Sequence, residues 1–250
     1  IGKIQDWDAN KFVKGEVDTY YIGDNTISKE NLRKYLDDSK FSVASNGVLY
    51  RTDTVGCIPG ILDLWFQKRV EYKNEMKKYG KAGDKEKYAF FHKRQLVQKI
   101  LLNSLYGVLG LPAFRFYDVD NATAVTTTGQ TVIKSTADMA NIKYNKELNT
   151  PDLDSNIYID TDSVFFSAVP LMDKRFPNWK DEEQDTIAGY VNDIAEEMQD
   201  YLNDFYDILS TKVLNVDKDK HRLEIKKEYV AKAGLWIAKK RYAQWIISDN

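Results

Sequence analysis

The sequence has 250 residues, of which 43% are hydrophobic and 30% are charged, and its formal net charge is −2. This composition is typical of a globular protein with a sizeable core, and it excludes collagen, coiled-coil arrays and intrinsically disordered chains. A single cysteine, Cys57, excludes an intrachain disulfide framework and favours a reducing compartment. The sequence has neither an apolar run of the roughly 20 residues that cross a bilayer nor a signal peptide, so we expect a cytoplasmic protein with no membrane partner.

Charged residues are unevenly distributed along the chain. Residues 66–100 carry eleven Lys and Arg against four acidic residues, and residues 220–242 carry eight against two. Residues 181–210 carry ten acidic residues and no Lys or Arg. Because a polyanion responds to local positive charge, we assign any nucleic-acid contact to the two basic segments. A solvated helix face is the alternative for each basic segment taken alone.

The first half of the chain combines short strands with a pair of helices. Residues 45–50 predict a turn followed by a short strand. Residues 61–79 and about 85–108 have helical apolar spacing, and Gly80 and Gly83 separate them. This pattern predicts an antiparallel two-helix hairpin with arms roughly 30 Å long, enough to project from the body of the protein.

The second half alternates helices with short strands. Residues 123–144 predict a helix, residues 156–166 predict a strand, an acidic turn and a strand, and residues 186–209 predict a long amphipathic helix. From residue 221 onward, the pattern predicts short strands joined by a turn at Gly234. The buried side of the first of these helices is expected to carry Val125, Val132, Ile133 and Met139. The fold class is therefore α+β.

Residues 158–163 (Tyr-Ile-Asp-Thr-Asp-Ser) carry two carboxylates, Asp160 and Asp162, between apolar strands. Like charges this close repel one another unless a cation lies between them, and Mg²⁺ selects hard oxygen ligands that leave room for phosphate oxygens. Two such ions roughly 3.5 to 4 Å apart stabilise the attacking and leaving oxygens of a phosphoryl transfer. An ordinary acidic β-turn is the alternative, since Asp and Ser are common turn residues.

The predicted helical hairpin carries a second candidate site. Lys99, Asn103 and Tyr106 are spaced by four and three residues, which places them on one face of the second arm. Arg69 and Lys73 lie one turn apart on the first arm. Such cations can hold a triphosphate and neutralise its developing charge. A solvated helix with a capping glycine is the alternative.

A third candidate site is the Lys-Lys-Arg-Tyr string at residues 239–242, which follows Gly-Leu-Trp at residues 234–236. Basic side chains beside aromatic ones suit a phosphate backbone with a sugar or base to pack on. A basic strand edge is the alternative, because edge lysines protect sheets from aggregation.

Together, and in this order, the three strings resemble motifs of the family B (α-like) DNA polymerases, and more closely of the replicative polymerases of T-even-type bacteriophages. The motif B pattern K-x-x-x-N-S-x-Y-G matches residues 99–107, the motif C pattern Y-x-D-T-D-S matches residues 158–163, and K-K-R-Y matches residues 239–242. The resemblance covers the whole chain. Shorter stretches of likeness lie at residues 45–50, 56–59, 121–124 and 128–130.

The resemblance implies a polymerase palm, an antiparallel sheet with packed helices, that carries a projecting two-helix fingers hairpin. It implies palm at residues 1–55, the part that follows motif A, fingers at residues 56–111, and palm again at residues 112–250, with motif C and K-K-R-Y. It also implies that the enzyme adds dNTPs to the 3′ end of a primer by two-metal phosphoryl transfer. Two Mg²⁺ ions are the implied cofactors, and primer–template DNA and dNTPs are the implied partners.

The resemblance assigns roles to individual residues. The implied metal ligands are Asp160, Asp162 and Glu228. The implied nucleotide-binding residues are Arg69, Lys73, Lys99, Asn103 and Tyr106, of which Tyr106 tests the minor-groove edge of the nascent base pair. The implied DNA-binding residues are Gly107, Lys239, Lys240, Arg241 and Tyr242. The implied catalytic residues are Asp160, Asp162 and Lys99. A shifted alignment would place Lys68 instead of Arg69 at the triphosphate.

The chain departs from the family pattern at two points. The D-x-x-S-L-Y-P-S stretch of motif A, with its metal-binding aspartate, is absent, and Ile159 stands where the family commonly has Gly. Because the chain also starts with Ile, we expect a palm and fingers piece that lacks motif A, the exonuclease and the thumb. We expect it to be inactive alone and to need a second chain or its own flanking segments. Whether it comes from a split gene or from a continuous enzyme stays open.

Other functions are compatible with parts of the pattern. A non-catalytic, polymerase-like nucleic-acid-binding module would explain the missing aspartate. A reverse transcriptase is disfavoured, because those enzymes carry a Y-x-D-D turn that this chain lacks. Protein-primed members of family B remain possible relatives. For a viral protein, the expected location is the host cytoplasm.

Overall fold

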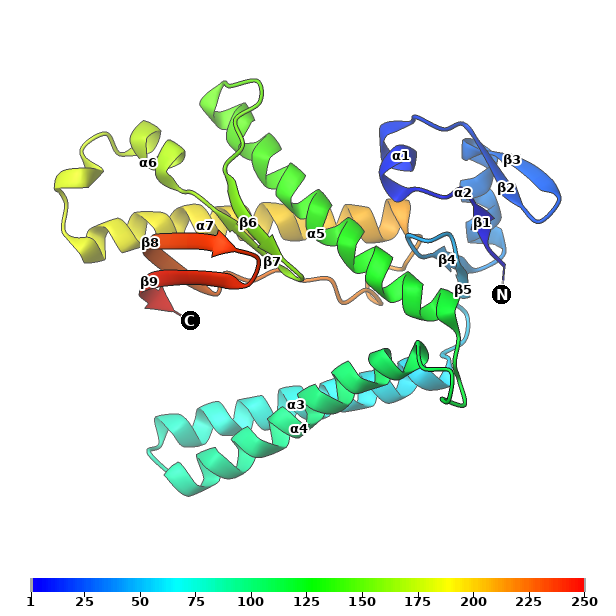
Figure 1. The fold of residues 1–250 in the computed structure, drawn as a ribbon, viewed down its shortest axis with the longest axis horizontal. Coiled ribbons are helices and arrows are strands. Elements are labelled where there is room, and N and C mark those ends of the chain that lie inside the picture. The colour runs from blue at the N-terminus through cyan, green and yellow to red at the C-terminus, as the bar shows by residue number, and fades with distance from the viewer. Residues whose placement is uncertain (1, 250) are drawn as a thin grey trace. The chain divides into compact units, whose positions relative to one another are not determined.

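A computed structural model describes residues 2–249, without the side chains of Lys14 and Asp249 (Figure 1). Long helices and small antiparallel sheets make up the described chain, which confirms the predicted α+β class. The chain divides into two compact units, one formed by Ile1–Asp8 with Val17–Thr127 and the other by Ala9–Glu16 with Thr128–Asn250. Among the described helices, none is both long and apolar enough to cross a membrane.

The first unit contains two small sheets and one short helix. Its strands are β1 (Ile4–Gln5), β2 (Thr19–Ile22) and β3 (Asn25–Ser28) in one antiparallel sheet, and β4 (Phe41–Val43) and β5 (Leu49–Arg51) in another. Ser28 starts the helix α2 (Lys29–Asp38) by accepting the N–H of Asn31. Leu32 and Leu36 are buried on one side of α2, as the helical period requires. The predicted turn at residues 45–50 is confirmed by the β4–β5 connection.

The first unit also contains the predicted helical hairpin, formed by α3 (Cys57–Lys81) and α4 (Lys85–Leu109). Figure 1 shows the two arms side by side and antiparallel. Tyr79 and Phe91 stack across the hairpin with ring centroids 5.6 Å apart. Gly83 turns the chain with φ +72°, and Asp84 caps α4 by accepting the N–H of Lys87. Among the described side chains of both arms, only that of Leu109 is fully buried.

The second unit packs three helices around a shared core. The helices are the part of α5 (Val119–Leu148) from residue 128, α6 (Val169–Arg175) and α7 (Gln184–Ile208), which continues into a π-helical turn at Leu209–Val213. The core is made of Ala140, Tyr144, Leu171, Met172, Ile194, Met198 and Leu202. The short helices α1 (Ala9–Lys14) and η1 (Trp179–Asp181) complete the helical part.

Two hairpins complete the second unit. They are β6 (Asn156–Asp160) with β7 (Ser163–Phe166), and β8 (Tyr229–Ala238) with β9 (Arg241–Asp249). The predicted turn at Gly234 is wrong, because the chain turns at Lys239 and Lys240 instead. Gly234 lies within β8 and pairs with Gln244. A Cβ at this position would collide with the indole ring of Trp236, so the glycine makes room for an aromatic side chain rather than for a turn.

The helix α5 also corrects one prediction. It begins four residues before and ends four residues after the predicted range of 123–144. Ile133 is buried and Met139 packs against the core, as expected. Val125 is half-exposed, because Ala124 is the residue that is buried at that turn.

Candidate active site

The carboxylate hairpin is the pair of strands β6 and β7 with the acidic turn between them. Asp160 pairs with Ser163, which leaves Thr161 and Asp162 to form the turn. Thr161 has φ +56°, and the N–H of Asp162 donates to the carbonyl of Asp160 over 2.6 Å. The hydroxyl of Ser163 donates to the same carbonyl over 3.1 Å. The backbone that carries both carboxylates is therefore fixed by short-range hydrogen bonds.

The two carboxylates have different surroundings. The side chain of Asp160 is 18% exposed, and its Oδ1 accepts the hydroxyl of Thr161 over 3.0 Å. Asp162 is exposed. The Nζ of Lys240 lies 3.9 Å from Oδ1 of Asp160, which places a cation beside the more buried carboxylate. Asp160 thus faces a positive charge, and Asp162 is open to solvent.

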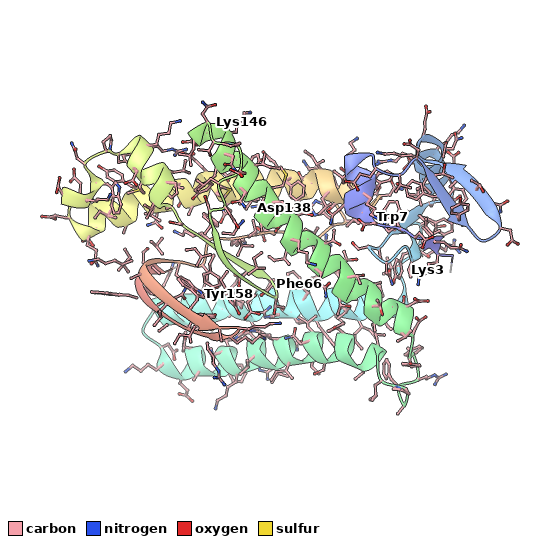
Figure 2. The ribbon with its side chains drawn as sticks, turned by 45° about the horizontal axis from the view of Figure 1, so that its top comes forward. Lys3, Trp7, Phe66, Asp138, Lys146 and Tyr158 are labelled. Atoms are coloured by element: carbon pink, nitrogen blue, oxygen red, sulfur yellow. The ribbon has the colours of Figure 1, made fainter. Side chains whose placement is uncertain are left out.

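The basic turn, residues 239–242, comes from the far end of the chain and meets the carboxylate hairpin. The backbone N–H of Lys240 donates to the hydroxyl of Tyr158 over 2.8 Å, across 82 positions of sequence. Tyr158, labelled in Figure 2, also contacts the ring of Tyr242, with centroids 5.6 Å apart. The structure therefore brings Asp160, Lys240 and Tyr242 together, a meeting that the sequence analysis did not predict. The roles of these residues stay predictions.

An aromatic cluster supports this meeting point. Phe165 contacts Tyr158, Trp236 and Tyr242 at centroid distances of 5.8 to 6.1 Å. Burial raises the pKa of Tyr229, and the nearby Tyr242 and Glu228 raise it further. Tyr229 therefore stays protonated at neutral pH and donates to Oε1 of Gln244 over 2.5 Å.

Among the described residues, no three or more His, Cys, Asp and Glu side chains gather closely enough to hold a metal ion. Asp160, Asp162 and Glu228 therefore do not form a three-ligand cluster in this structure. The two hairpin carboxylates still match the ligand chemistry of Mg²⁺, which is bound through one or two carboxylates together with phosphate oxygens and water.

The predicted nucleotide-binding residues lie on the helical hairpin of the first unit. Arg69 and Lys73 lie on α3, and Lys99, Asn103 and Tyr106 lie on α4. The three α4 residues are all exposed. The open space beside Gly107, within 4 Å of where a Cβ would stand, leaves room for a close approach by another molecule.

The two candidate cations at positions 68 and 69 differ in their partners. Lys68 pairs with Glu71 over 2.9 Å, and this contact raises the pKa of Lys68. Arg69 is partly buried, and its Nε has no hydrogen-bond partner among the described residues. Lys68 is therefore paired at the surface, whereas Arg69 keeps one buried nitrogen without a partner among the described residues.

Tyr158 and Phe165 are the residues of this site to which the sequence analysis assigned no role. A signal for Tyr158 exists in the sequence, because residues two apart on a strand share a face and Tyr158 therefore accompanies Asp160. No comparable signal links Tyr158 to Lys240 or Phe165 to Tyr242, since these contacts join distant parts of the chain.

Comparisons with known proteins give the family. The model of DNA polymerase family B matches residues 21–175, well over half of the chain. The DNA-directed DNA polymerase of Enterobacteria phage T4 is 35% identical over an alignment of 162 residues that covers 60% of this chain and 17% of the phage protein. That of Escherichia phage RB69 is 42% identical over 80 residues, which are 32% of this chain and 9% of the phage protein.

A more distant relative covers more of the chain. The DNA polymerase of Thermococcus gorgonarius is 27% identical over 226 residues, which are 90% of this chain and 23% of the archaeal protein. The chain thus spans less than a quarter of the length of each of these relatives. The matched range of the family model includes the motif B and motif C residues described above. This chain belongs to DNA polymerase family B.

Proposed function

We propose that the protein takes part in template-directed DNA synthesis, the addition of dNTPs to the 3′ end of a primer. One observation carries the proposal: the basic turn meets the carboxylate hairpin, with Lys240 bonded to Tyr158 over 2.8 Å and 3.9 Å from Asp160. A phosphate-attracting cation beside a hard-oxygen ligand suits a primer terminus next to a metal-assisted phosphoryl transfer. Membership of family B supports the same reaction.

In this proposal, Asp160 and Asp162 hold divalent metal, for which Mg²⁺ is the expected ion. Family B DNA polymerases depend on divalent metal in general, and the two carboxylates supply the hard oxygens that Mg²⁺ prefers. When bound, Mg²⁺ neutralises the charge that develops on phosphate oxygens. Glu228 is proposed as an additional acidic residue near the metals.

The remaining motif residues bind the substrates. Lys99, Arg69 and Lys73 hold the triphosphate of the incoming nucleotide, while Asn103 and Tyr106 face its base pair. Gly107 and the cations and aromatic ring of the basic turn hold the DNA. Under this proposal, residues 56–111 are the fingers, and residues 1–55 and 112–250 belong to the palm.

The motif A aspartate belongs to the same proposal. The sequence contains no D-x-x-S-L-Y-P-S stretch, so we propose that a segment outside these 250 residues supplies the aspartate. That segment lies on a second chain or on a flanking part of the same chain, together with the exonuclease and the thumb. The 250 residues alone are then expected to bind dNTP and DNA without extending a primer.

Primer extension tests this proposal. The chain is incubated with a primer–template, Mg²⁺ and all four dNTPs, with Asp162→Asn as the control for contaminating polymerase. We expect no extension above the control, while Mg²⁺-dNTP binding measured by titration calorimetry is retained and weakened in Asp162→Asn. Extension that Asp162→Asn abolishes would show that the site is complete within this chain. Loss of both dNTP and DNA binding would rule out the function.

A non-catalytic nucleic-acid-binding module is the second candidate. It is favoured by the finding that, in the described part of the chain, no third carboxylate joins Asp160 and Asp162. Such a module binds primer–template DNA but not Mg²⁺-dNTP, so the same calorimetric titration distinguishes the two functions.

A further inference from the structure

The turn between β8 and β9 holds an unusual backbone conformation. Lys240 has φ +60°, in the left-handed region that residues other than glycine rarely adopt. Residues in such regions persist only when the surrounding structure holds them there. Lys240 therefore needs a partner that fixes its backbone.

Tyr158 supplies that partner. Its hydroxyl lies 2.8 Å from the backbone nitrogen of Lys240 and accepts the N–H. Its ring is held in turn by Phe165 and Tyr242, at centroid distances of 6.0 and 5.6 Å. Because the ring is packed on two sides, the hydroxyl is aimed at the turn by the fold itself.

The same strand also holds the carboxylate that faces Lys240. Tyr158 and Asp160 are two residues apart on β6 and share a face of the hairpin. Tyr158 binds the backbone of Lys240, and Asp160 lies 3.9 Å from its ammonium group. One strand thus contacts both the backbone and the ammonium group of the same lysine.

We propose that Tyr158 is a positioning residue: its hydroxyl fixes the backbone of the basic turn beside Asp160, so that the cations offered to DNA keep a set distance from the carboxylates. The role in DNA binding rests on the proposed function. The fixing of the turn does not, because it depends only on the hydrogen bond and the ring contacts.

Tyr158→Phe removes the hydroxyl and keeps the ring. Tyr229→Phe is the matched control, because it also removes one hydroxyl hydrogen bond within the β8–β9 hairpin, but that bond goes to the side chain of Gln244 and not to the backbone of the turn. Thermal unfolding of both variants checks that they fold like the wild type. Amide hydrogen exchange, measured by NMR, then reports on Lys240 without any need for activity.

We expect the Lys240 amide to exchange about fivefold faster in Tyr158→Phe and at the wild-type rate in Tyr229→Phe, as the loss of one net hydrogen bond predicts. Equal exchange rates in the wild type and Tyr158→Phe would overturn the positioning role, whatever the protein does with DNA.

Binding of a labelled primer–template, followed by fluorescence anisotropy over a range of salt concentrations, tests the consequence for DNA. We expect Tyr158→Phe to bind about fivefold more weakly with an unchanged salt slope, whereas Lys240→Gln should lower that slope by about one. Affinity equal to that of Tyr229→Phe would overturn the link to DNA. A wild type that binds no DNA would instead refute the proposed function and leave the exchange result standing.

Discussion

The buried hydroxyl of Tyr206 illustrates how much a single residue depends on its neighbour. It lies 2.7 Å from Oγ1 of Thr136, which itself donates to the carbonyl of Val132 over 2.7 Å. The Tyr206 hydroxyl is therefore the donor in the pair. Both side chains are buried, so removing the acceptor and removing the donor should lower the stability by different amounts.

We predict that Thr136→Val lowers the free energy of unfolding by about 1 to 3 kcal/mol, because it leaves the buried Tyr206 hydroxyl without an acceptor. Tyr206→Phe should cost less, about 1 kcal/mol, because Thr136 keeps its bond to Val132. Urea unfolding of the two variants measures the difference, and a larger loss in Tyr206→Phe would contradict this account.

Arg175 joins two helices through charge. Its guanidinium lies 2.6 Å from Glu147 on α5 and 2.8 Å from Glu197 on α7. Hydrogen bonds from Arg175 lower the pKa of both carboxyls below their ordinary values. A carboxyl with a lowered pKa in the folded state stabilises the protein above its unfolded-state pKa, and this stabilisation is lost as the pH falls through the folded-state pKa.

We therefore predict that Arg175→Met lowers the free energy of unfolding by about 2 kcal/mol at pH 7. The difference from wild type should shrink below a pH of about 4.5, where unfolded glutamates take up protons. Urea unfolding at a series of pH values from neutral to acid tests this, and Arg222→Met, at an exposed site, serves as the control. A difference that stays constant over the whole series would exclude the ionic explanation.

The candidate site was partly predictable at the residue scale. The spacing of Asp160 and Asp162 and the Lys-Lys-Arg-Tyr string identified the two ends of the site, because both are local patterns. The bond between Tyr158 and Lys240 was not predictable, because it joins residues 82 positions apart through packing that no local spacing encodes. The left-handed backbone of Lys240 likewise has no sequence signal, since lysine carries no preference for it.

At the element scale, the sequence predicted hairpins correctly where the spacing of neighbouring residues determines the fold. Helical spacing and two glycines indicated α3 and α4, and the structure extends these helices by only a few residues. The turn of the β8–β9 hairpin was misplaced, because Gly234 serves the packing of Trp236 and not a turn. A glycine in a sequence marks a position without a Cβ, but the sequence does not say whether the fold needs glycine there for backbone freedom or for space.

Gly234→Ala tests that explanation. The added methyl group would collide with the Trp236 ring and displace it from the aromatic cluster, which should cost about 1 to 3 kcal/mol of stability. Gly129→Ala is the control within α5, where the Cβ position is open, and it should stabilise the protein by about 0.5 to 1 kcal/mol. Thermal unfolding compares the two variants, and equal effects would refute the collision.

The cap of α4 gives a prediction for the helical hairpin. The side chain of Asp84 accepts the N–H of Lys87 over 3.0 Å, and this bond lowers the pKa of Asp84. We predict that Asp84→Ala speeds amide exchange in the first turn of α4, whereas Asp84→Asn, which keeps a capping oxygen, changes it little. Because the described arms bury only Leu109, the effect should stay local. Faster exchange throughout both units in Asp84→Ala would contradict this.

At the scale of the whole molecule, exposed apolar surface is the property with the clearest consequence. Leu235, Ile237 and Trp245 are exposed to 61%, 76% and 61%. Leu235 and Trp245 lie on the same face of the β8–β9 hairpin. Trp245 pairs with Ala233, which is two residues from Leu235 on β8, and both paired residues and residues two apart share a face. Exposed apolar side chains that gather on one face mark association surfaces or aggregation sites.

We predict that the 250-residue chain self-associates as its concentration rises, and that Ile237→Lys reduces the association. Sedimentation velocity at several concentrations measures it, with Lys232→Arg as a control that keeps the charge of the same strand. A clean monomer at high concentration would contradict the prediction.

The separation of 82 positions between Tyr158 and Lys240 also sets the order in which the site forms during synthesis. The α3–α4 hairpin joins neighbouring segments, so it can close within microseconds of leaving the ribosome. The carboxylate hairpin is complete once residue 166 has been made, yet the lysine beside Asp160 arrives several seconds later at about 5 to 20 residues per second. Until residue 240 has been translated, a nascent chain therefore carries Asp160 without the cation beside it, and a ribosome that stalls before then leaves the meeting point unmade.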